Sequence, residues 1–360
     1  MVLLAAAAAQ FGRDLDFDLD RVTTIVAAAR RAGAALLVLP DGTLGGYLND
    51  LREPDVARGP ELSGPVAPVS APVGSDGFGP VEVAVEVEVA RVGVGDLTDL
   101  GPVGVGPEGV ATAGSNGDEP DELPPALAAD DPVFDRLAEL AGDLVLCLGY
   151  RERAGALTYN AAVCLSGAGV HGRHRKVHLA PGERVSYTSG DRFEAFDTPI
   201  GRLGMLIDYD KTFPEAARAL AEDGAVVLAC LSAWPASLTD PARRVVKDRQ
   251  ARLFDLYDCA RAAENQVVLV SANQTGRGGA LTFLGNAKVV GPGGDIRART
   301  WQKAGLAMAE VDLDAEVSRA RRVLYHLAER RPAAYRPAGW PAEPLPVDEP
   351  LPVDEPLRVD

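Results

Sequence analysis

The sequence has no excess of positive charge and no apolar run long enough to cross a membrane. Its 360 residues include 36 Lys and Arg against 52 Asp and Glu, which gives a formal net charge of −16. This acidity argues against a nucleic-acid partner and against binding to an anionic membrane, because both need a positive surface. A bilayer-spanning helix needs about 20 consecutive apolar residues. The composition therefore predicts an acidic, soluble protein.

Paired cysteines are also lacking. The four cysteines, Cys147, Cys164, Cys230 and Cys259, form no CxxC motif. The first three stand inside apolar runs, where cysteine acts as a small buried hydrophobe. We expect no disulfide framework and a reducing compartment, and we predict a cytoplasmic location.

The N-terminal region predicts a β-α-β unit. The opening "MVLLAAAAAQF" lacks the basic residues that begin a signal peptide, so we expect a buried strand at residues 2–9. Apolar residues at helical spacing predict a helix over Asp18–Ala34, and Ala35–Pro40 is typical of a strand that ends at proline. This order indicates an α/β fold with helices packed on a mixed or parallel sheet.

Two segments differ in composition from the rest. Residues 52–131 are rich in Gly, Pro and Val, and we interpret them as a low-complexity, largely disordered insertion. Within it, Val81–Val92 alternates strictly and could form a strand. Residues 336–360 carry three copies of an "EPLPVD"-like repeat and predict an extended, solvated tail. The predicted folded domain comprises residues 1–51 and 132–335.

Order is predicted to resume near Pro132. We expect buried strands to alternate with helices, including a long helix over residues 240–266. The other predicted elements are helices at 131–143, 213–225 and 316–324, and strands at 144–152, 157–167, 226–235, 267–276, 284–296 and 304–314.

Four polar residues follow apolar strands. Asp41 comes after "LLVLP", Lys176 lies in "GRHRKVHL", Glu183 lies in "LAPGER" and Asp208 comes after "GMLI". Taken singly, a carboxylate after a strand is usually a turn residue or a helix cap. Their order along the chain and the sequence around them favour a common site.

Taken together, several stretches resemble the nitrilase superfamily of carbon–nitrogen hydrolases. They are "LLVLPDGTLGGY", "GYRE" with "YNAAV", "GRHRKVHL", "GRLGMLIDYDKTFPEAARALA", "LSAWP", "RAAENQVVLVSAN" and "VVGPGGDI". The resemblance implies an α-β-β-α sandwich that commonly dimerises, so that the sheets of two subunits stack with helices outside. It also implies a homo-oligomer, a dimer or larger. We expect no cofactor, and Lys176 among the acids argues against a metal.

The resemblance assigns roles to the four polar residues. Family members use a Cys nucleophile, a Glu general base, a Lys that stabilises the oxyanion, and often a second Glu. Lys176 matches the Lys and Glu183 the second Glu, whereas Asp41 falls on the first Glu and Asp208 on the Cys. A carboxylate is a weak nucleophile compared with a thiolate. Asp41 is one methylene shorter than Glu, and a displacement of about 1 Å can lower the rate roughly 100-fold.

The altered site also predicts a ligand preference. Three carboxyl groups around one lysine cannot all stay ionised without partners. If Lys176 pairs with Asp208, the remaining acids would be protonated or seek a cation. We therefore expect a small nitrogen-containing ligand, cationic or amine-bearing, rather than an anion or a metal. Candidate wall residues are Tyr47, Tyr209 and Trp234.

Three hypotheses follow for the function. In the first, the protein is an inactive or strongly impaired homologue that acts by binding a ligand or a partner subunit. In the second, it hydrolyses amide, carbamoyl or nitrile bonds, with Asp208 as general base for water and Lys176 holding the oxyanion. In the third, it is an assembly protein that uses its insertion and tail for contacts.

Overall fold

The computed structural model describes residues 1–51 and 123–335. Most of the predicted insertion, with the expected strand at Val81–Val92, lies outside the described residues, and so does the proline-rich tail. The last part of that predicted insertion, residues 123–131, is described and contains the short strand β3 (Ala126–Leu127), which pairs with β4 (Val145–Ala154).

The described strands form one sheet that is nearly closed on itself. Its main path runs in the order β6-β5-β4-β2-β1-β10-β9-β8-β7, and the strands from β4 to β8 along this path are parallel to one another. The other strands join at β1, β4, β10 and β12. The remaining bounds are β1 Val2–Ala9, β2 Ala34–Val38, β5 Leu157–Ser166, β6 Gly169–Arg175, β7 Phe196–Thr198, β8 Gly201–Ile207, β9 Val227–Ser232, β10 Val268–Gly278, β11 Leu281–Leu284, β12 Lys288–Val290, β13 Ile296–Arg299 and β14 Gly305–Val311.

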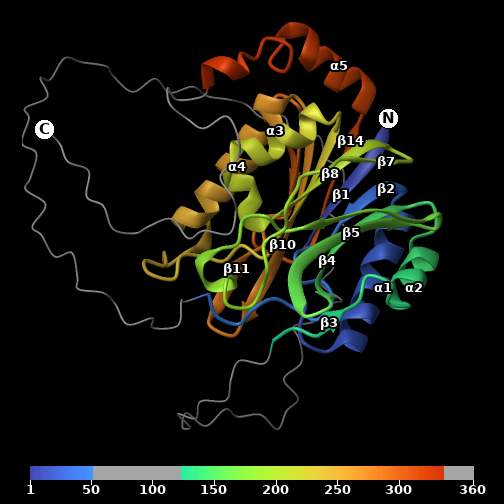
Figure 1. Cartoon of the computed structure of the whole chain (residues 1–360), viewed down its shortest axis with the longest axis vertical. Coiled ribbons are helices and arrows are strands. Elements are labelled where there is room, and N and C mark those ends of the chain that lie inside the picture. The colour runs from blue at the N-terminus through green and yellow to red at the C-terminus, as the bar shows by residue number, and fades with distance from the viewer. Residues whose placement is uncertain (52–122, 336–360) are drawn as a thin grey trace, which may run out of the picture.

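The chain is layered as an α-β-β-α sandwich, as predicted. Buried side chains of β2, β4 and β5 face those of β8 and β9 in an inner core that includes Val38, Cys147 and Met205. A second core lies between the outer face of β2, β4 and β5 and the helices α1 (Leu15–Arg31) and α2 (Val133–Ala141). A third lies under α3 (Pro214–Glu222) and α4 (Arg249–Asn265). Figure 1 shows the two helical layers on opposite sides of the strands.

The long helix predicted over residues 240–266 is shorter in the structure. Helix α4 begins at Arg249, after a 3-10 turn at Val245–Lys247. The buried Asp248 is the cause, because its carboxylate accepts hydrogen bonds from the backbone N–H groups of Ser237, Ala242 and Gln250. An aspartate that satisfies free N–H groups in this way begins a helix. The last helix, α5 (Leu313–Val323), begins after Asp312 in the same manner.

This topology brings three strand ends together. Strands β2, β6 and β8 run in the same direction, so the residues after them lie at one edge of the sandwich. Because the sheet folds back, β8 packs against β5 and β6. Ligand sites of α/β proteins commonly form at the carboxyl ends of strands. None of the described helices is both long and apolar enough to cross a membrane.

Candidate active site

Asp208 stands on a sharp turn at the end of β8. The strand ends at Ile207, and a 3-10 helix, η2 (Asp208–Thr212), follows at once. Asp208 has a φ of +48°, in the left-handed region that non-glycine residues seldom adopt. Such strain persists only where the surroundings hold it, and it clusters at functional sites. The turn projects the side chain of Asp208, a residue that is only 6% exposed.

Asp210 holds this turn against the segment that follows β6. Its carboxylate accepts hydrogen bonds from the backbone N–H groups of Ile207, Val177 and His178 at 3.2, 3.2 and 2.9 Å. The ring nitrogens of His174 and His178 each lie 3.0 Å from one of its oxygens. Burial opposes ionisation, but these contacts hold the pKa of Asp210 below its usual range. Asp210 therefore fixes the distance between the Asp208 turn and Lys176.

Lys176 lies at the centre of the site and is fully buried. Its Nζ is 2.7 Å from Oε2 and 2.9 Å from Oε1 of Glu183, and 3.4 Å from Oδ2 of Asp208. Burial acts to lower the pKa of Lys176, yet the surrounding carboxylates, Glu183 foremost, raise it above its ordinary value. Lys176 is thus a cation at neutral pH. Its closer partner is Glu183, and Asp208 is the more distant one.

Glu183 and Asp41 complete the cluster. Glu183 lies on η1 (Pro181–Glu183) and accepts hydrogen bonds from the hydroxyl of Tyr47 at 2.8 Å and from the backbone N–H of Ala180 at 2.7 Å. The side-chain amide of Asn160 donates to both Glu183 and Asp41, at 3.2 and 2.9 Å. The structure therefore brings all four predicted residues together. The prediction missed Asn160, although a polar residue in the apolar strand "YNAAVCL" was a signal for it.

Burial raises the pKa values of two acids in the site, Asp41 and Asp208. Burial raises the pKa of Asp41 to about 8, although the nearby Lys176 pulls it down. Burial also raises the pKa of Asp208, again opposed by Lys176. One lysine cannot keep three buried carboxyl groups ionised, because each charged form loses its hydration. At neutral pH Asp41 is therefore mainly protonated.

The three predicted wall residues lie in different environments. Tyr47 touches the site directly through Glu183, and burial followed by the charge of Glu183 raises the pKa of its hydroxyl well above the ordinary value. Tyr209 is half-buried, with its ring edge-on to Phe213. Trp234 packs in a separate cluster against Phe254 and donates its indole N–H to Gln250 at 3.0 Å.

A second buried charge cluster lies behind the Asp208 turn and was not predicted. Asp258 of α4 pairs with Lys211 of η2 at 2.9 Å and with Lys288 of β12 at 2.8 Å. All three side chains are fully buried, and the two ammonium groups lie 3.2 and 3.9 Å from the centre of the Phe254 ring. Both lysines lower the pKa of Asp258 despite its burial. The only signal in the sequence was that these charged residues stand among apolar ones.

None of the four cysteines offers an activated thiol to this site. Cys147, Cys164 and Cys230 are fully buried in the strands, as predicted, and Cys259 is partly buried on α4. Cys230 lies opposite Leu206 of β8, and burial raises the pKa of its thiol to about 12. A thiol with so high a pKa stays protonated at neutral pH and is a poor nucleophile. Over the described ranges 1–51 and 123–335, no group of three or more His, Cys, Asp and Glu could hold a metal ion.

Among proteins of known sequence, this chain is similar to nitrilases and amidases. It is 31% identical over 217 residues to a probable nitrilase of Schizosaccharomyces pombe, covering 58% of this chain and 75% of that protein. It is 36% identical over 195 residues to the human deaminated glutathione amidase, covering 51% and 56%. An (R)-stereoselective amidase of a Pseudomonas species is 34% identical over 190 residues, covering 52% and 65%. The chain thus spans less than two thirds of the latter two proteins.

Solved structures show the same fold. A carbon–nitrogen hydrolase from Helicobacter pylori superposes with a TM-score of 0.64 at 21% identity, over 93% of this chain and 96% of that one. An amidase from Nesterenkonia sp. superposes with a TM-score of 0.59 at 20% identity, over 92% and 94%. One form of that amidase shows covalent addition of the acetamide moiety of fluoroacetamide at its active-site cysteine. The sequence pattern of the family described as carbon–nitrogen hydrolase matches residues 3–321, and the chain therefore belongs to this family, within the nitrilase superfamily.

Proposed function

We propose that this protein keeps the carbon–nitrogen hydrolase scaffold but does not perform cysteine-dependent hydrolysis, and that it acts by binding a small amine-bearing ligand or a partner subunit. One observation carries the proposal: a carboxyl group, Asp208, occupies the strained turn beside Lys176, where the resemblance places the nucleophile. The Nesterenkonia amidase reacts through a cysteine. This chain has no thiol at the corresponding turn.

The chemistry of the turn supports the loss of the covalent route. Attack by Asp208 on an amide would form an anhydride and would have to expel an amine, which is a poor leaving group. The contact to Lys176 also stabilises the carboxylate and lowers its reactivity. Burial keeps Asp41 protonated at neutral pH, so it cannot act there as a general base.

The same geometry supports an amine ligand. Oδ1 of Asp208 is buried and has no hydrogen-bond partner among the described residues. A buried polar atom of this kind is satisfied by a donor. An ammonium group would supply that donor and a positive charge beside three carboxyl groups. A homo-oligomer, which the resemblance implies, remains a prediction.

A second candidate function rests on that same atom. With its pKa raised, Asp208 could accept a proton from a water molecule at Oδ1, while Lys176 stabilises the oxyanion of the substrate. This would be an active hydrolase of non-peptide amide, carbamoyl or nitrile bonds that forms no acyl-enzyme.

The test compares the native protein with Asp208→Cys and Asp208→Asn on a panel of amides, carbamoyl amines and nitriles. We expect no hydrolysis by the native protein or by Asp208→Asn. Hydrolysis by Asp208→Cys alone would show that the rest of the site is intact and that the missing nucleophile is the whole loss. Hydrolysis by the native protein that is lost in Asp208→Asn would support the general-base function instead. A covalent adduct on Asp208, detected by mass spectrometry during turnover, would overturn both candidates.

Reactivity and ligand binding supply independent measurements. Fluoroacetamide should label Asp208→Cys much faster than Asp20→Cys, which places a thiol on the exposed face of α1. For the ligand, a thermal-shift series should show stabilisation of the native protein by small primary amines. Equal stabilisation by small carboxylates would contradict the amine preference.

A further inference from the structure

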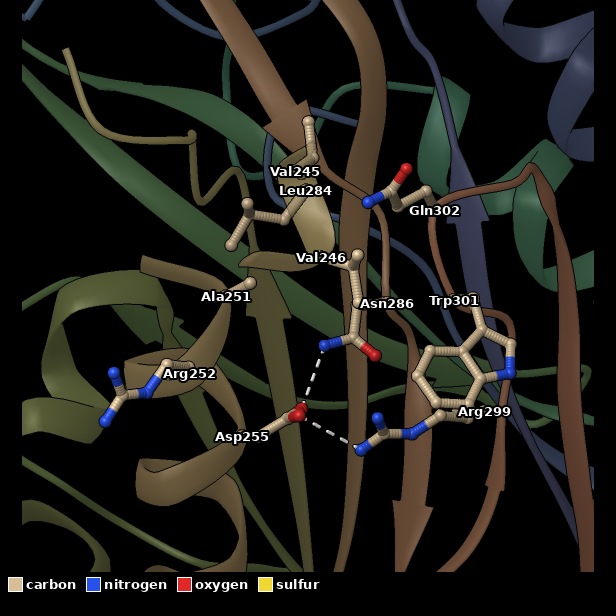
Figure 2. Close-up of a pocket in the computed structure, with 10 residues that line it drawn as sticks. All are labelled: Val245, Val246, Ala251, Arg252, Asp255, Leu284, Asn286, Arg299, Trp301 and Gln302. Carbon is tan, nitrogen blue, oxygen red and sulfur yellow. Dashed lines mark hydrogen bonds and ion pairs between the residues drawn. The ribbon is translucent and has the colours of Figure 1, made fainter. Parts of the chain in front are cut away.

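A small pocket lies at the opposite end of the buried lysine cluster from Asp208. It has a volume of about 50 Å³ and lies between the start of α4, the segment around Val245 and the turn that joins β13 to β14. Figure 2 shows an apolar side formed by Val245 and Leu284 and a polar side formed by Asn286 and Arg299. One water fills about 10–15 Å³ of such space, so the pocket accepts a group of several non-hydrogen atoms.

Asn286 presents an unsatisfied acceptor to this pocket. Its side-chain amide donates to Oδ1 of Asp255 at 2.8 Å, which orients the amide oxygen away from Asp255. That oxygen is buried and has no hydrogen-bond partner in the described chain, although Asn286 is only 7% exposed. In Figure 2 it faces the ring of Trp301. Buried polar atoms are nearly always paired, so this one calls for an N–H or O–H donor from outside the chain.

A chain of ion pairs ends at the pocket with Arg299. Asp255 contacts Arg299 at 3.1 Å and Lys288 at 3.2 Å, and Lys288 continues through Asp258 to Lys211. Burial lowers the pKa of Lys288, so the charge that faces the pocket rests on Arg299. Arg299 uses one nitrogen for Asp255, and its planar group has further N–H donors that suit a carboxylate.

The pocket also has an exposed aromatic ring at its edge. Trp301 is 57% exposed, and its φ is +58°, an unfavourable conformation for a bulky residue. The guanidinium of Arg299 lies 4.5 Å from the centre of its ring. An aromatic ring held in this position offers one face to a ligand and reports on it by fluorescence.

We propose that this pocket binds a small carboxylate that also carries a hydroxyl or amide hydrogen next to it, such as a two- or three-carbon α-hydroxy acid. The carboxylate pairs with Arg299, the donor group satisfies the amide oxygen of Asn286, and the carbon atoms contact Val245 and Leu284. This site is distinct from the Lys176 cluster, and it does not depend on whether Asp208 supports hydrolysis.

The test uses three matched probes on the full chain, followed by calorimetry and by Trp301 fluorescence. Glycolate has both the charge and the donor, acetate lacks the donor, and glycolamide lacks the charge. We expect glycolate to bind with a Kd of about 1 mM or tighter, as the limits for so small a ligand allow. Acetate and glycolamide should each bind about 10-fold more weakly, which corresponds to one lost polar interaction. Equal affinity for all three probes, or no binding of glycolate, would overturn the proposal.

Matched variants locate the binding. Arg299→Gln removes the charge at the pocket and should weaken glycolate binding about 10-fold. Arg297→Gln removes the same charge from the same strand, outside the pocket lining, and should leave binding within about twofold. The fluorescence change on binding should disappear in Trp301→Phe while the calorimetric signal persists. Equal loss in the two arginine variants would show that glycolate binds elsewhere and would refute the assignment.

Discussion

Replacing Asp41 by Asn should stabilise the protein at neutral pH. Burial raises the pKa of Asp41 to about 8, whereas an unfolded aspartate has its ordinary value of 3.8. Between these two values the folded state binds a proton that the unfolded state has released, so stability falls as the pH rises through this window. At pH 7 the solution lies about 3 pH units above the pKa of the unfolded aspartate. At about 1.4 kcal/mol per unit, the loss of stability has an upper limit near 4 kcal/mol. Asn has no such penalty and can still accept the hydrogen bond from Asn160.

The assay is urea unfolding, followed by circular dichroism, at several values from pH 4 to pH 8. Asp41→Asn and the native protein should be about equally stable at pH 4, and the variant should become progressively more stable toward pH 8. The control is Asp20→Asn, which changes an exposed carboxylate on α1 and should differ from the native protein by less than about 0.5 kcal/mol at every pH. The slope of unfolding with urea should stay unchanged, since the exposed surface does not change.

Two results would refute this reasoning. If the stabilities of Asp41→Asn and the native protein change with pH in parallel, Asp41 has the same pKa in the folded and the unfolded state, and burial does not set that pKa. If the variant is less stable at pH 7, Asp41 is ionised there and its attraction to Lys176 exceeds the cost of burial. Either outcome would also remove the argument that Asp41 cannot act as a general base at neutral pH.

Two further substitutions test how the site is supported. Asp258→Asn leaves Lys211 buried without its ion-pair partner and leaves Lys288 with Asp255 alone, and we expect a loss of about 3–5 kcal/mol in urea unfolding; a loss below about 1 kcal/mol would mean that the two lysines do not need Asp258. Gly149→Ala would place a methyl group 2.8 Å from the backbone of Asp41, and it should lower the free energy of unfolding by about 1–3 kcal/mol. The measurement is thermal unfolding, and an unchanged melting temperature would show that the backbone around Asp41 moves to accommodate the methyl group.

The amino-acid sequence was sufficient to find the four candidate residues and the fold class. Asp41 and Asp208 each follow an apolar strand, whereas Lys176 follows the mostly polar β6 and, like Glu183, was assigned through the resemblance. Strand periodicity and strand ends are local properties, so they can be identified without coordinates. The start of α4 did not follow from the local pattern, because Asp248 begins a new helix inside a stretch that has helical propensity on both sides of it.

Only the tertiary structure decided the contacts within the site. Asn160 reaches Asp41 across 119 residues, and Tyr47 reaches Glu183 across 136, and no local spacing encodes either hydrogen bond. The sheet folds back and brings these groups together, and burial then sets which acid is ionised. The same closure made Glu183 the nearer partner of Lys176, at 2.7 Å, and left Asp208 at 3.4 Å. The chemistry of this site follows from packing at long range, which residue type and order alone do not determine.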